Sequence, residues 1–374
     1  MQFFRGIPIV FLVVITPVTH SLPDFGVGNY ECENDVMRKS KSVPINVNSV
    51  RPADINVVMA LGDSLTAGNG AAATNVSDVI LQYRGLSFGA GGDGSIENHV
   101  TIPNILKKYN ANLFGYSKGI GSQNIWSSAQ LNAAVPGAHA SHLPGQARQL
   151  ISLLQQHNDL VNMKEDWKLL NIFIGANDIC DYCINSDDKP SNDVAFIKEA
   201  IQLIMDNVPR VIVSLTSTLH LEMLRQIEVG NEQCAQMHKK ECHCVNVADT
   251  PVTNLTETIN EYNRLEMELQ TSGYFERDDF TVIIQPFFSN TVQPPVKNGQ
   301  PDLTFFAPDC FHFSQLGHSI VSTHLWKNIM SPVAAKQNQV NITNAAVPLS
   351  CPDLSCPFIR TVLNSNDCTT YLMP

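Results

Sequence analysis

Residues 55–69 read INVVMALGDSLTAGN, a run of apolar residues followed by a polar turn. The run at 55–61 is short and rich in β-branched residues, which favours a buried strand. Gly62 and Asp63 are poor strand residues, so the sequence places Ser64 at the carboxyl end of this strand. In an open α/β sheet, ligands bind at that end. An ordinary strand-ending turn uses the same residue types, so the turn alone leaves both interpretations open.

The rest of the chain alternates short apolar runs with amphipathic stretches. Strands are predicted at Leu131–Val135, Trp167–Ile174, Arg210–Leu215 and Phe280–Gln285, and helices from about Leu143, at 193–207, at Leu255–Ser272 and at about 314–330. Such alternation is typical of a parallel sheet covered by helices. The sequence therefore predicts one α/β/α domain, although its length alone would also allow two.

Two further polar turns follow predicted strands. Gly137 lies in a strand-to-helix turn, where a glycine lets the backbone approach a ligand and offers an unobstructed N–H group. Asn177, in the sequence GAND at 175–178, supplies an amide donor suited to a developing oxyanion. A plain turn glycine and a helix N-cap are the alternatives. The nearby His139 and His142 are expected to be surface residues at a helix start.

The segment 305–318, FFAPDCFHFSQLGH, places Asp309 three residues before His312 in a turn. This spacing lets the carboxylate accept a hydrogen bond from the imidazole Nδ1–H and leaves Nε2 free to act as a base. Carboxylates and histidines also occur near helix starts for capping reasons, so the pair alone is a weak signal. Together with Ser64, Gly137 and Asn177 at strand ends, it predicts a serine hydrolase site.

Two other motifs are given no catalytic role. GYSKG at 115–119 fits the G-x-S-x-G nucleophile pattern, but no strong strand precedes it and no helix follows, so Ser117 is interpreted as a loop serine. The glycine-rich stretch 83–95, YRGLSFGAGGDGS, lacks the ending of a P-loop and the spacing of a dinucleotide site. A flexible surface loop that borders the substrate cleft is the preferred interpretation.

Composition excludes some classes of partner. With 44% hydrophobic and 16% charged residues, the 374-residue chain is predicted to be globular. Its net charge of −11 argues against nucleic-acid binding and gives no attraction to anionic lipid surfaces. Contact with lipid aggregates or a membrane surface would therefore be apolar and transient.

The first residues indicate export. Residues 1–21 are predicted to be a signal peptide, because their apolar run of about a dozen residues is shorter than the ~20 that a bilayer span requires. No long apolar tail follows Ser331, so no C-terminal anchor is expected and the protein is predicted to be secreted and extracellular. The sequons at Asn75, Asn254 and Asn341 are predicted glycosylation sites on surface loops.

The ten cysteines all follow the predicted signal peptide. In an oxidising compartment this even number predicts up to five disulfides, whose connectivity the sequence does not reveal. Two groups of residues have side chains that zinc could bind. The first is Cys180 with Cys183, and the second consists of the cysteines and histidines at 234–244. The second group lacks a paired C-x2-C spacing. Structural disulfides are therefore preferred, and no metal site and no cofactor are predicted.

Several motifs together resemble one family. They are GDSLTAGNG at 62–70, YRGLSF with GGDG within 83–94, GANDICD at 175–181, QPFF at 285–288 and FFAPDCFHFS at 305–314. On these residues the chain resembles the GDSL, or SGNH, hydrolase superfamily, and within it the secreted or membrane-associated phospholipase B branch of animals. The resemblance covers roughly residues 50–330. It implies a flavodoxin-like α/β/α sandwich with a central parallel sheet, the SGNH hydrolase fold.

The resemblance also divides the chain into segments. They are a signal peptide at 1–21, an N-terminal extension at 22–50, an SGNH hydrolase domain at 51–331 and a cysteine-containing tail at 332–374. Membrane-bound relatives carry several catalytic repeats and a C-terminal anchor, whereas this sequence shows one copy and no anchor. The tail from Pro332 lies outside the resemblance and receives no functional interpretation.

The family's four signature residues fall on Ser64, Gly137, Asn177 and His312. The resemblance implies that His312, oriented by Asp309, activates Ser64 as the nucleophile. The backbone N–H groups of Ser64 and Gly137 and the side-chain amide of Asn177 would form the oxyanion hole. The expected function is a phospholipase B-type ester hydrolase that releases fatty acids from phospholipids and lysophospholipids. A carbohydrate or small-ester deacetylase is the alternative, and a catalytically inactive secreted binding protein is a more distant one.

Overall fold

The computed structural model describes residues 24–246, 251–343 and 348–372. The signal peptide predicted at 1–21 lies outside these residues. The N-terminal extension is described from Asp24 onward and the C-terminal tail in two parts.

The centre of the fold is a parallel sheet of four strands in the order β1-β2-β3-β4. The strands are β1 (Ile55–Gly62), β2 (Trp167–Phe173), β3 (Val211–Thr216) and β4 (Phe280–Gln285). Almost every residue in them is buried, because helices cover both faces of the sheet. This burial explains why the strands appear in the sequence as nearly continuous apolar runs. A separate two-stranded hairpin is formed by β5 (Val296–Lys297) and β6 (Gln300–Pro301).

The strand predicted at 131–135 is wrong in detail. The segment lies beside β1 but forms only an isolated bridge between Asn132 and Ala60. On its other side, the guanidinium of Arg84 donates to the carbonyl oxygens of Asn132 and Ala134 at 2.9 and 2.7 Å. A buried side chain thus satisfies the carbonyl groups that another strand would have used. The sheet edge ends here in irregular structure.

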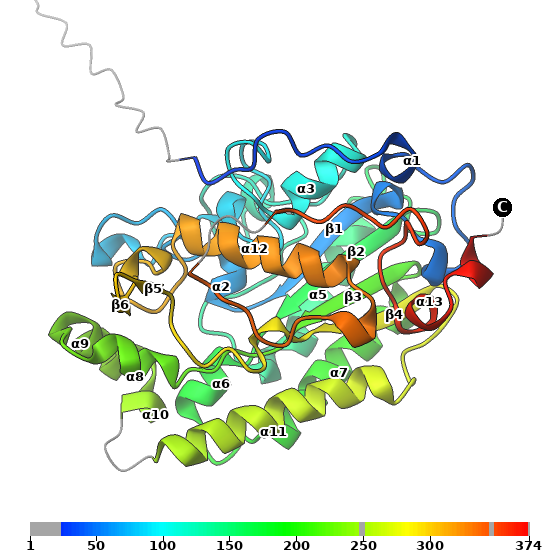
Figure 1. Cartoon of the computed structure of the whole chain (residues 1–374). Helices are drawn as coiled ribbons and strands as arrows, with labels where there is room; N and C mark the ends of the chain where they lie inside the picture. Colours follow the sequence, from blue (N-terminus) through cyan, green and yellow to red (C-terminus); the bar gives the residue numbers. More distant parts are fainter. Residues whose placement is uncertain (1–23, 247–250, 344–347, 373–374) are drawn as a thin grey trace, which may run out of the picture.

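Helices pack on both faces of the sheet, as the three-layer prediction requires (Figure 1). One face carries α5 (Leu143–Gln156), α7 (Pro190–Asn207) and α11 (Val252–Thr271), and the other carries α3 (Ile102–Tyr109) and α12 (Gln315–Met330). The fold is thus α/β with a central parallel sheet, consistent with the SGNH hydrolase fold.

The longer helices begin where the sequence offers start signals. Pro190 occupies the first position of α7, where its missing N–H group costs no hydrogen bond. The hydroxyl of Ser314 caps α12 by accepting a hydrogen bond from the Gly317 N–H at 3.2 Å. Because its cap lies directly after the segment 305–313, the start of α12 fixes where that segment ends.

Further helices lie between these elements and near the two ends of the described chain. They are α1 (Asn34–Met37), α2 (Ser64–Ala67), α4 (Trp126–Ala129), α6 (Ala176–Asp181), α8 (Met223–Glu228), α9 (Glu232–Glu241), α10 (His243–Asn246) and α13 (Val362–Asn366). Two of them, α2 and α6, begin within three residues of the ends of β1 and β2. The helices α8, α9 and α10 follow β3 and extend away from the sheet (Figure 1).

All ten cysteines form disulfides, as predicted. The pairs are Cys32–Cys351, Cys180–Cys242, Cys183–Cys244, Cys234–Cys310 and Cys356–Cys368. None of these thiols is therefore available to bind zinc. Three of the bonds anchor the α9–α10 region, two of them to the end of α6 and one to the segment that precedes α12.

The C-terminal tail packs against the hydrolase region. The Ile359 N–H donates to the carbonyl oxygen of Val50 at 2.9 Å, and the Arg360 N–H donates to that of Ile329 at 3.1 Å. Cys351 is bonded to Cys32 in the N-terminal extension. The two ends of the described chain are therefore joined to each other and to the core.

Candidate active site

Ser64 is the first residue of α2 and follows β1 by two positions. Asp63 accepts a hydrogen bond from the Leu65 N–H at 2.9 Å through its side chain and so caps this short helix. Its other carboxylate oxygen is buried without a partner among the described residues, and burial raises the pKa of Asp63 to about 7. The turn holds the Ser64 hydroxyl at the carboxyl edge of the sheet with 6% of the residue exposed.

His312 lies beside Ser64, although 248 positions separate the two residues in the chain. The distance from His312 Nε2 to Ser64 Oγ is 2.8 Å, and that from His312 Nδ1 to Asp309 Oδ2 is 2.5 Å. With Asp309 ionised, Nδ1–H donates to the carboxylate, and Nε2 accepts from the serine hydroxyl. The three side chains form a continuous hydrogen-bonded chain.

Asp309 is held by its own turn. Its Oδ1 accepts hydrogen bonds from the N–H groups of Phe311 and His312 at 3.0 and 3.1 Å, and the residue is fully buried. Burial alone would raise the pKa of Asp309, but the hydrogen bond and charge of His312, with these N–H groups, outweigh it and lower that pKa. Asp309 therefore stays ionised beside the imidazole.

A third carboxyl group, from Glu241 at the end of α9, lies beside this pair. Ligand atoms of Glu241, Asp309 and His312 lie within 4.8 Å of one another. One Glu241 oxygen is buried and has no hydrogen-bond partner in the described chain. Burial, and then the charge of Asp309, raise the pKa of Glu241 to about 7.

Sequence reasoning did not find Glu241. Its place depends on the disulfide between Cys234 and Cys310, which joins α9 to the segment that carries His312. The even number of cysteines was visible in the sequence, but this pairing was not. No pattern around Glu241 itself distinguishes it from an ordinary helix residue.

Burial lowers the pKa of His312, whereas neighbouring carboxyl groups raise it. The hydrogen bond and charge of Asp309 act most strongly, followed by the charges of Glu241 and Asp63, and the net shift is upward. A raised pKa means that the imidazole loses its proton, and can act as a base, only at a higher pH than usual.

Gly137 lies on a loop, and Asn177 is the second residue of the neighbouring helix α6. The side-chain amide of Asn177 donates to the carbonyl oxygen of Ala138 at 2.9 Å. Gly137 is exposed and has a φ of +72°, a backbone conformation that favours glycine. The Val135 N–H donates to the carbonyl oxygen of Gly62 at 3.1 Å, which brings this loop to the turn that carries Ser64. The three polar turns therefore lie at one edge of the sheet.

The remaining predicted positions take no part in the hydrogen bonds of this site. Asn75, Asn254 and Asn341 are all exposed, but Asn254 lies in the first turn of α11 and not on a loop as predicted. Ser117 is fully buried, and its hydroxyl donates to the carbonyl oxygen of Ala129 at 2.9 Å. Ser117 has only an isolated bridge to Gly91 and no strand, in agreement with a loop serine.

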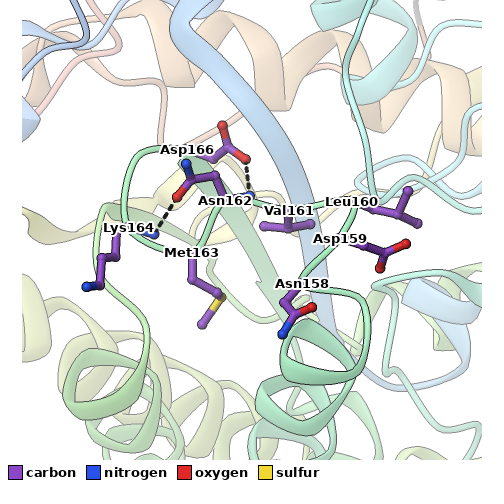
Figure 2. A pocket seen from close by; sticks show the side chains of 8 residues that line it. All are labelled: Asn158, Asp159, Leu160, Val161, Asn162, Met163, Lys164 and Asp166. Atoms are coloured by element: carbon purple, nitrogen blue, oxygen red, sulfur yellow. Dashed lines mark hydrogen bonds between the residues drawn. The ribbon is translucent and has the colours of Figure 1, made fainter.

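A pocket lined by 158–164 and Asp166 belongs to the opposite end of the sheet (Figure 2). These residues directly precede β2, whose first residue, Trp167, is paired with Ile55 at the start of β1. Ser64 follows the far end of β1. The pocket is therefore separated from the candidate site by the length of the strand.

Comparisons with known proteins agree with this geometry. The sequence model of the GDSL-like lipase/acylhydrolase family matches residues 58–325. The chain is 42% identical over 339 residues to "Phospholipase B1, membrane-associated" of Homo sapiens. That alignment covers 86% of this chain and 23% of the human protein. It is 40% identical over 337 residues to the protein of that name in Mus musculus. That alignment covers 87% of this chain and 22% of the mouse protein.

The chain thus spans less than a quarter of the length of these relatives. The family match begins within β1 and ends within α12, so it includes Ser64, Gly137, Asn177 and the Asp309–His312 pair. The family resemblance predicted from the motifs is confirmed. The chain belongs to the GDSL-like lipase/acylhydrolase family of hydrolases.

Proposed function

We propose that Ser64, His312 and Asp309 are the catalytic triad of a serine ester hydrolase. The observation that carries this proposal is the hydrogen-bonded chain from Ser64 Oγ through the imidazole to the Asp309 carboxylate, with separations of 2.8 and 2.5 Å. A base within hydrogen-bond reach of the nucleophile, oriented in turn by a third group, is the arrangement that activates a serine.

The reaction follows from these atoms. His312 Nε2 takes the proton of Ser64 as Oγ attacks the ester carbonyl carbon, which gives a tetrahedral oxyanion. When this intermediate collapses, the imidazolium returns the proton to the leaving alcohol and an acyl-enzyme remains. Water then attacks the acyl-enzyme with His312 again acting as base, and a carboxylic acid leaves.

The oxyanion is assigned to donors on three turns. The backbone N–H groups of Ser64 and Gly137 have no hydrogen-bond acceptor among the described residues. The Asn177 amide uses one of its N–H bonds on Ala138 and has a second to offer. Donors already fixed in place stabilise a developing charge without having to reorganise.

Phospholipids and lysophospholipids are the proposed substrates, with fatty acids as products. The support is the likeness to proteins named phospholipase B1 together with the intact set of site residues. No helix of the described residues is long and apolar enough to cross a bilayer. We assign the protein to the outside of the cell because its five disulfides favour an oxidising compartment.

A substrate panel tests this function. The purified full chain is assayed on lysophospholipid, diacyl phospholipid and an acetylated sugar, beside the variants Ser64→Ala and Ser117→Ala. We expect fatty acid release from both lipids, abolished in Ser64→Ala and retained in Ser117→Ala, whose serine lies outside the triad. Faster cleavage of the acetylated sugar would overturn the lipid assignment, and activity in Ser64→Ala would overturn the triad.

A further inference from the structure

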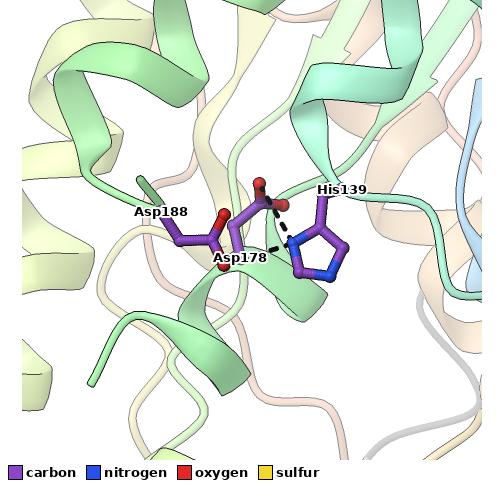
Figure 3. A group of neighbouring side chains, drawn as sticks. All are labelled: His139, Asp178 and Asp188. Atoms are coloured by element: carbon purple, nitrogen blue, oxygen red, sulfur yellow. Dashed lines mark ion pairs between the residues drawn. The ribbon is translucent and has the colours of Figure 1, made fainter. Parts of the chain in front are cut away.

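A second cluster of polar side chains lies next to the candidate oxyanion donors. Figure 3 shows the imidazole of His139 directed toward the carboxylates of Asp178 and Asp188. His139 follows Gly137 by two positions, Asp178 follows Asn177 directly, and Asp188 precedes α7. Three segments that are far apart in the chain therefore meet at one point.

The distances within this cluster do not fit hydrogen bonds. His139 Nδ1 is 3.4 Å from Asp188 Oδ2 and 3.8 Å from Asp178 Oδ1, whereas N–H···O bonds span about 2.7–3.2 Å. Ligand atoms bound at about 2.0–2.2 Å around a tetrahedral ion lie roughly 3.4 Å apart. The separation of 3.4 Å equals the edge of such a coordination shell, and that of 3.8 Å is longer; both are ion-pair distances.

Burial strengthens the case. Asp178 is 1% exposed and Asp188 is 8% exposed, so neither carboxylate is well solvated. Asp193, in the first turn of α7, is 3% exposed and faces Asp178 and Asp188. Its carboxyl group shares a side-chain hydrogen bond with Asp178. Three buried carboxyl groups thus face one imidazole, and a cation bound among them would offset their mutual repulsion.

The surrounding groups resemble the outer shell of a metal centre. The Ala140 N–H donates to both oxygens of Asp178 at 2.9 and 3.2 Å, and the Asn185 amide donates to Asp188 at 2.9 Å. The second ring nitrogen of His139 faces a carboxylate oxygen of Asp181 at 3.7 Å, an ion-pair distance that is too long for a hydrogen bond. Histidines that bind metals usually direct their other ring nitrogen to such a group, which fixes the ring.

We propose that His139, Asp178 and Asp188 bind a divalent metal ion, with Asp193 beside them as a further carboxylate donor. One imidazole nitrogen among carboxylate oxygens suits Zn²⁺ or Mn²⁺, whereas Ca²⁺ and Mg²⁺ prefer oxygen ligands throughout. The ion would join the loop of Gly137 to the helix α6, which carries Asn177, and to the segment before α7. Its role is structural, because it is not placed in the triad.

Metal binding can be measured on the full disulfide-bonded chain without any assay of hydrolysis. The protein is freed of metal with a chelator, and Zn²⁺, Mn²⁺ or Ca²⁺ is added in thermal unfolding and calorimetric titrations. We expect one Zn²⁺ or Mn²⁺ per chain and a higher Tm, with weaker binding of Ca²⁺. Absence of any saturable one-to-one binding to the unaltered chain would overturn the proposal.

Two variants and a matched control locate the ion. Asp188→Asn and His139→Gln each remove a ligand, and we expect affinity to fall by more than about tenfold, the least that loss of an outer-shell partner causes. Asp187→Asn removes the same charge from an exposed neighbour and should bind as the unaltered chain does. Equal binding by Asp188→Asn and Asp187→Asn would place the ion elsewhere and contradict the proposal.

The result is independent of the proposed hydrolysis. Ser64→Ala should bind the ion with unchanged affinity, because Ser64 supplies no ligand. A chain that binds metal but hydrolyses no lipid would contradict only the proposed function. A chain that hydrolyses lipid but binds no metal would contradict only this inference.

Discussion

The two carboxyl groups beside His312, Asp309 and Glu241, have pKa values that are shifted in opposite directions. Asp309 is fully buried yet stays ionised, because His312 and two backbone N–H groups outweigh the cost of burial. Glu241 has fewer partners, and burial together with Asp309 raises its pKa to about 7. These opposite shifts follow from the number of donors that each carboxyl group meets.

Asn177→Ala tests the oxyanion assignment. Loss of one such donor typically costs about 3 kcal/mol in transition-state stabilisation, or roughly a hundred- to a thousand-fold in rate. The lost hydrogen bond to Ala138 should cost only about 1 kcal/mol of stability, so we expect the fold to persist. Measurement of kcat beside Tm separates the two effects. A folded variant with near-normal kcat would remove Asn177 from the oxyanion hole.

Glu241→Gln tests whether this carboxylate influences the base. The charged groups that face His312 are Asp309, Glu241 and Asp63, and each raises its pKa. The imidazole must be unprotonated to accept the serine proton, so a raised pKa moves the onset of activity to higher pH. Removing the Glu241 charge should therefore shift the acidic limb of the kcat/KM profile to lower pH.

The control for this shift lies on the same helix. Glu232→Gln removes a charge from the exposed start of α9 and should leave the profile unchanged. If both variants gave the profile of the unaltered protein, Glu241 would have no electrostatic effect on His312.

At the scale of elements, α9 and the segment before α12 act together. The bond between Cys234 and Cys310 joins them, and His238 Nε2 lies 3.0 Å from the carbonyl oxygen of Cys310. Cys310 directly follows Asp309 and lies two positions before His312. The helix α9, which follows β3, is thereby joined to the loop that carries the proposed base.

Removing this disulfide should impair both stability and turnover. The cysteines are 76 residues apart, and closure of a loop of that size contributes about 4 kcal/mol in the chain-entropy account. We expect the double variant Cys234→Ser with Cys310→Ser to have a lower Tm and a lower kcat at temperatures where it is folded.

The bond between Cys356 and Cys368 provides the comparison. It closes a loop of 12 residues in the C-terminal tail and should contribute about 3 kcal/mol. Its removal should lower Tm and leave kcat unchanged, since the tail holds no residue of the triad. If both double variants kept full kcat, the Cys234–Cys310 bond would have no part in positioning His312.

The sequence predicted some elements better than others, for physical reasons. Strands buried on both faces give continuous apolar runs, so β1 to β4 were predicted close to their observed bounds. The strand prediction at 131–135 is wrong because Arg84, which is remote in sequence, donates hydrogen bonds to two carbonyl oxygens of this segment. The sequence predicts His139 at a helix start, where it lies, but it predicts neither Glu241 beside the proposed triad nor the carboxyl groups beside His139. Their neighbours come from other segments, so no local pattern marked them.

Across the whole molecule, parallel strands bring distant residues to one edge. The strands of the sheet run in the same direction. Ser64 follows β1, Asn177 follows β2, and the pair at 309–312 precedes α12. The disulfide between Cys32 and Cys351 closes the two ends of the described chain over this core. The site depends on the complete fold, because no single segment contains it.

Labelling with a fluorophosphonate tests most directly whether Ser64 is an activated nucleophile. The reagent forms a stable bond to an activated serine, and intact-mass measurement with peptide mapping shows where it is attached. The triad predicts one adduct per chain, on Ser64, with labelling strongly reduced in His312→Ala. An adduct on another serine, or equal labelling in His312→Ala, would contradict the account.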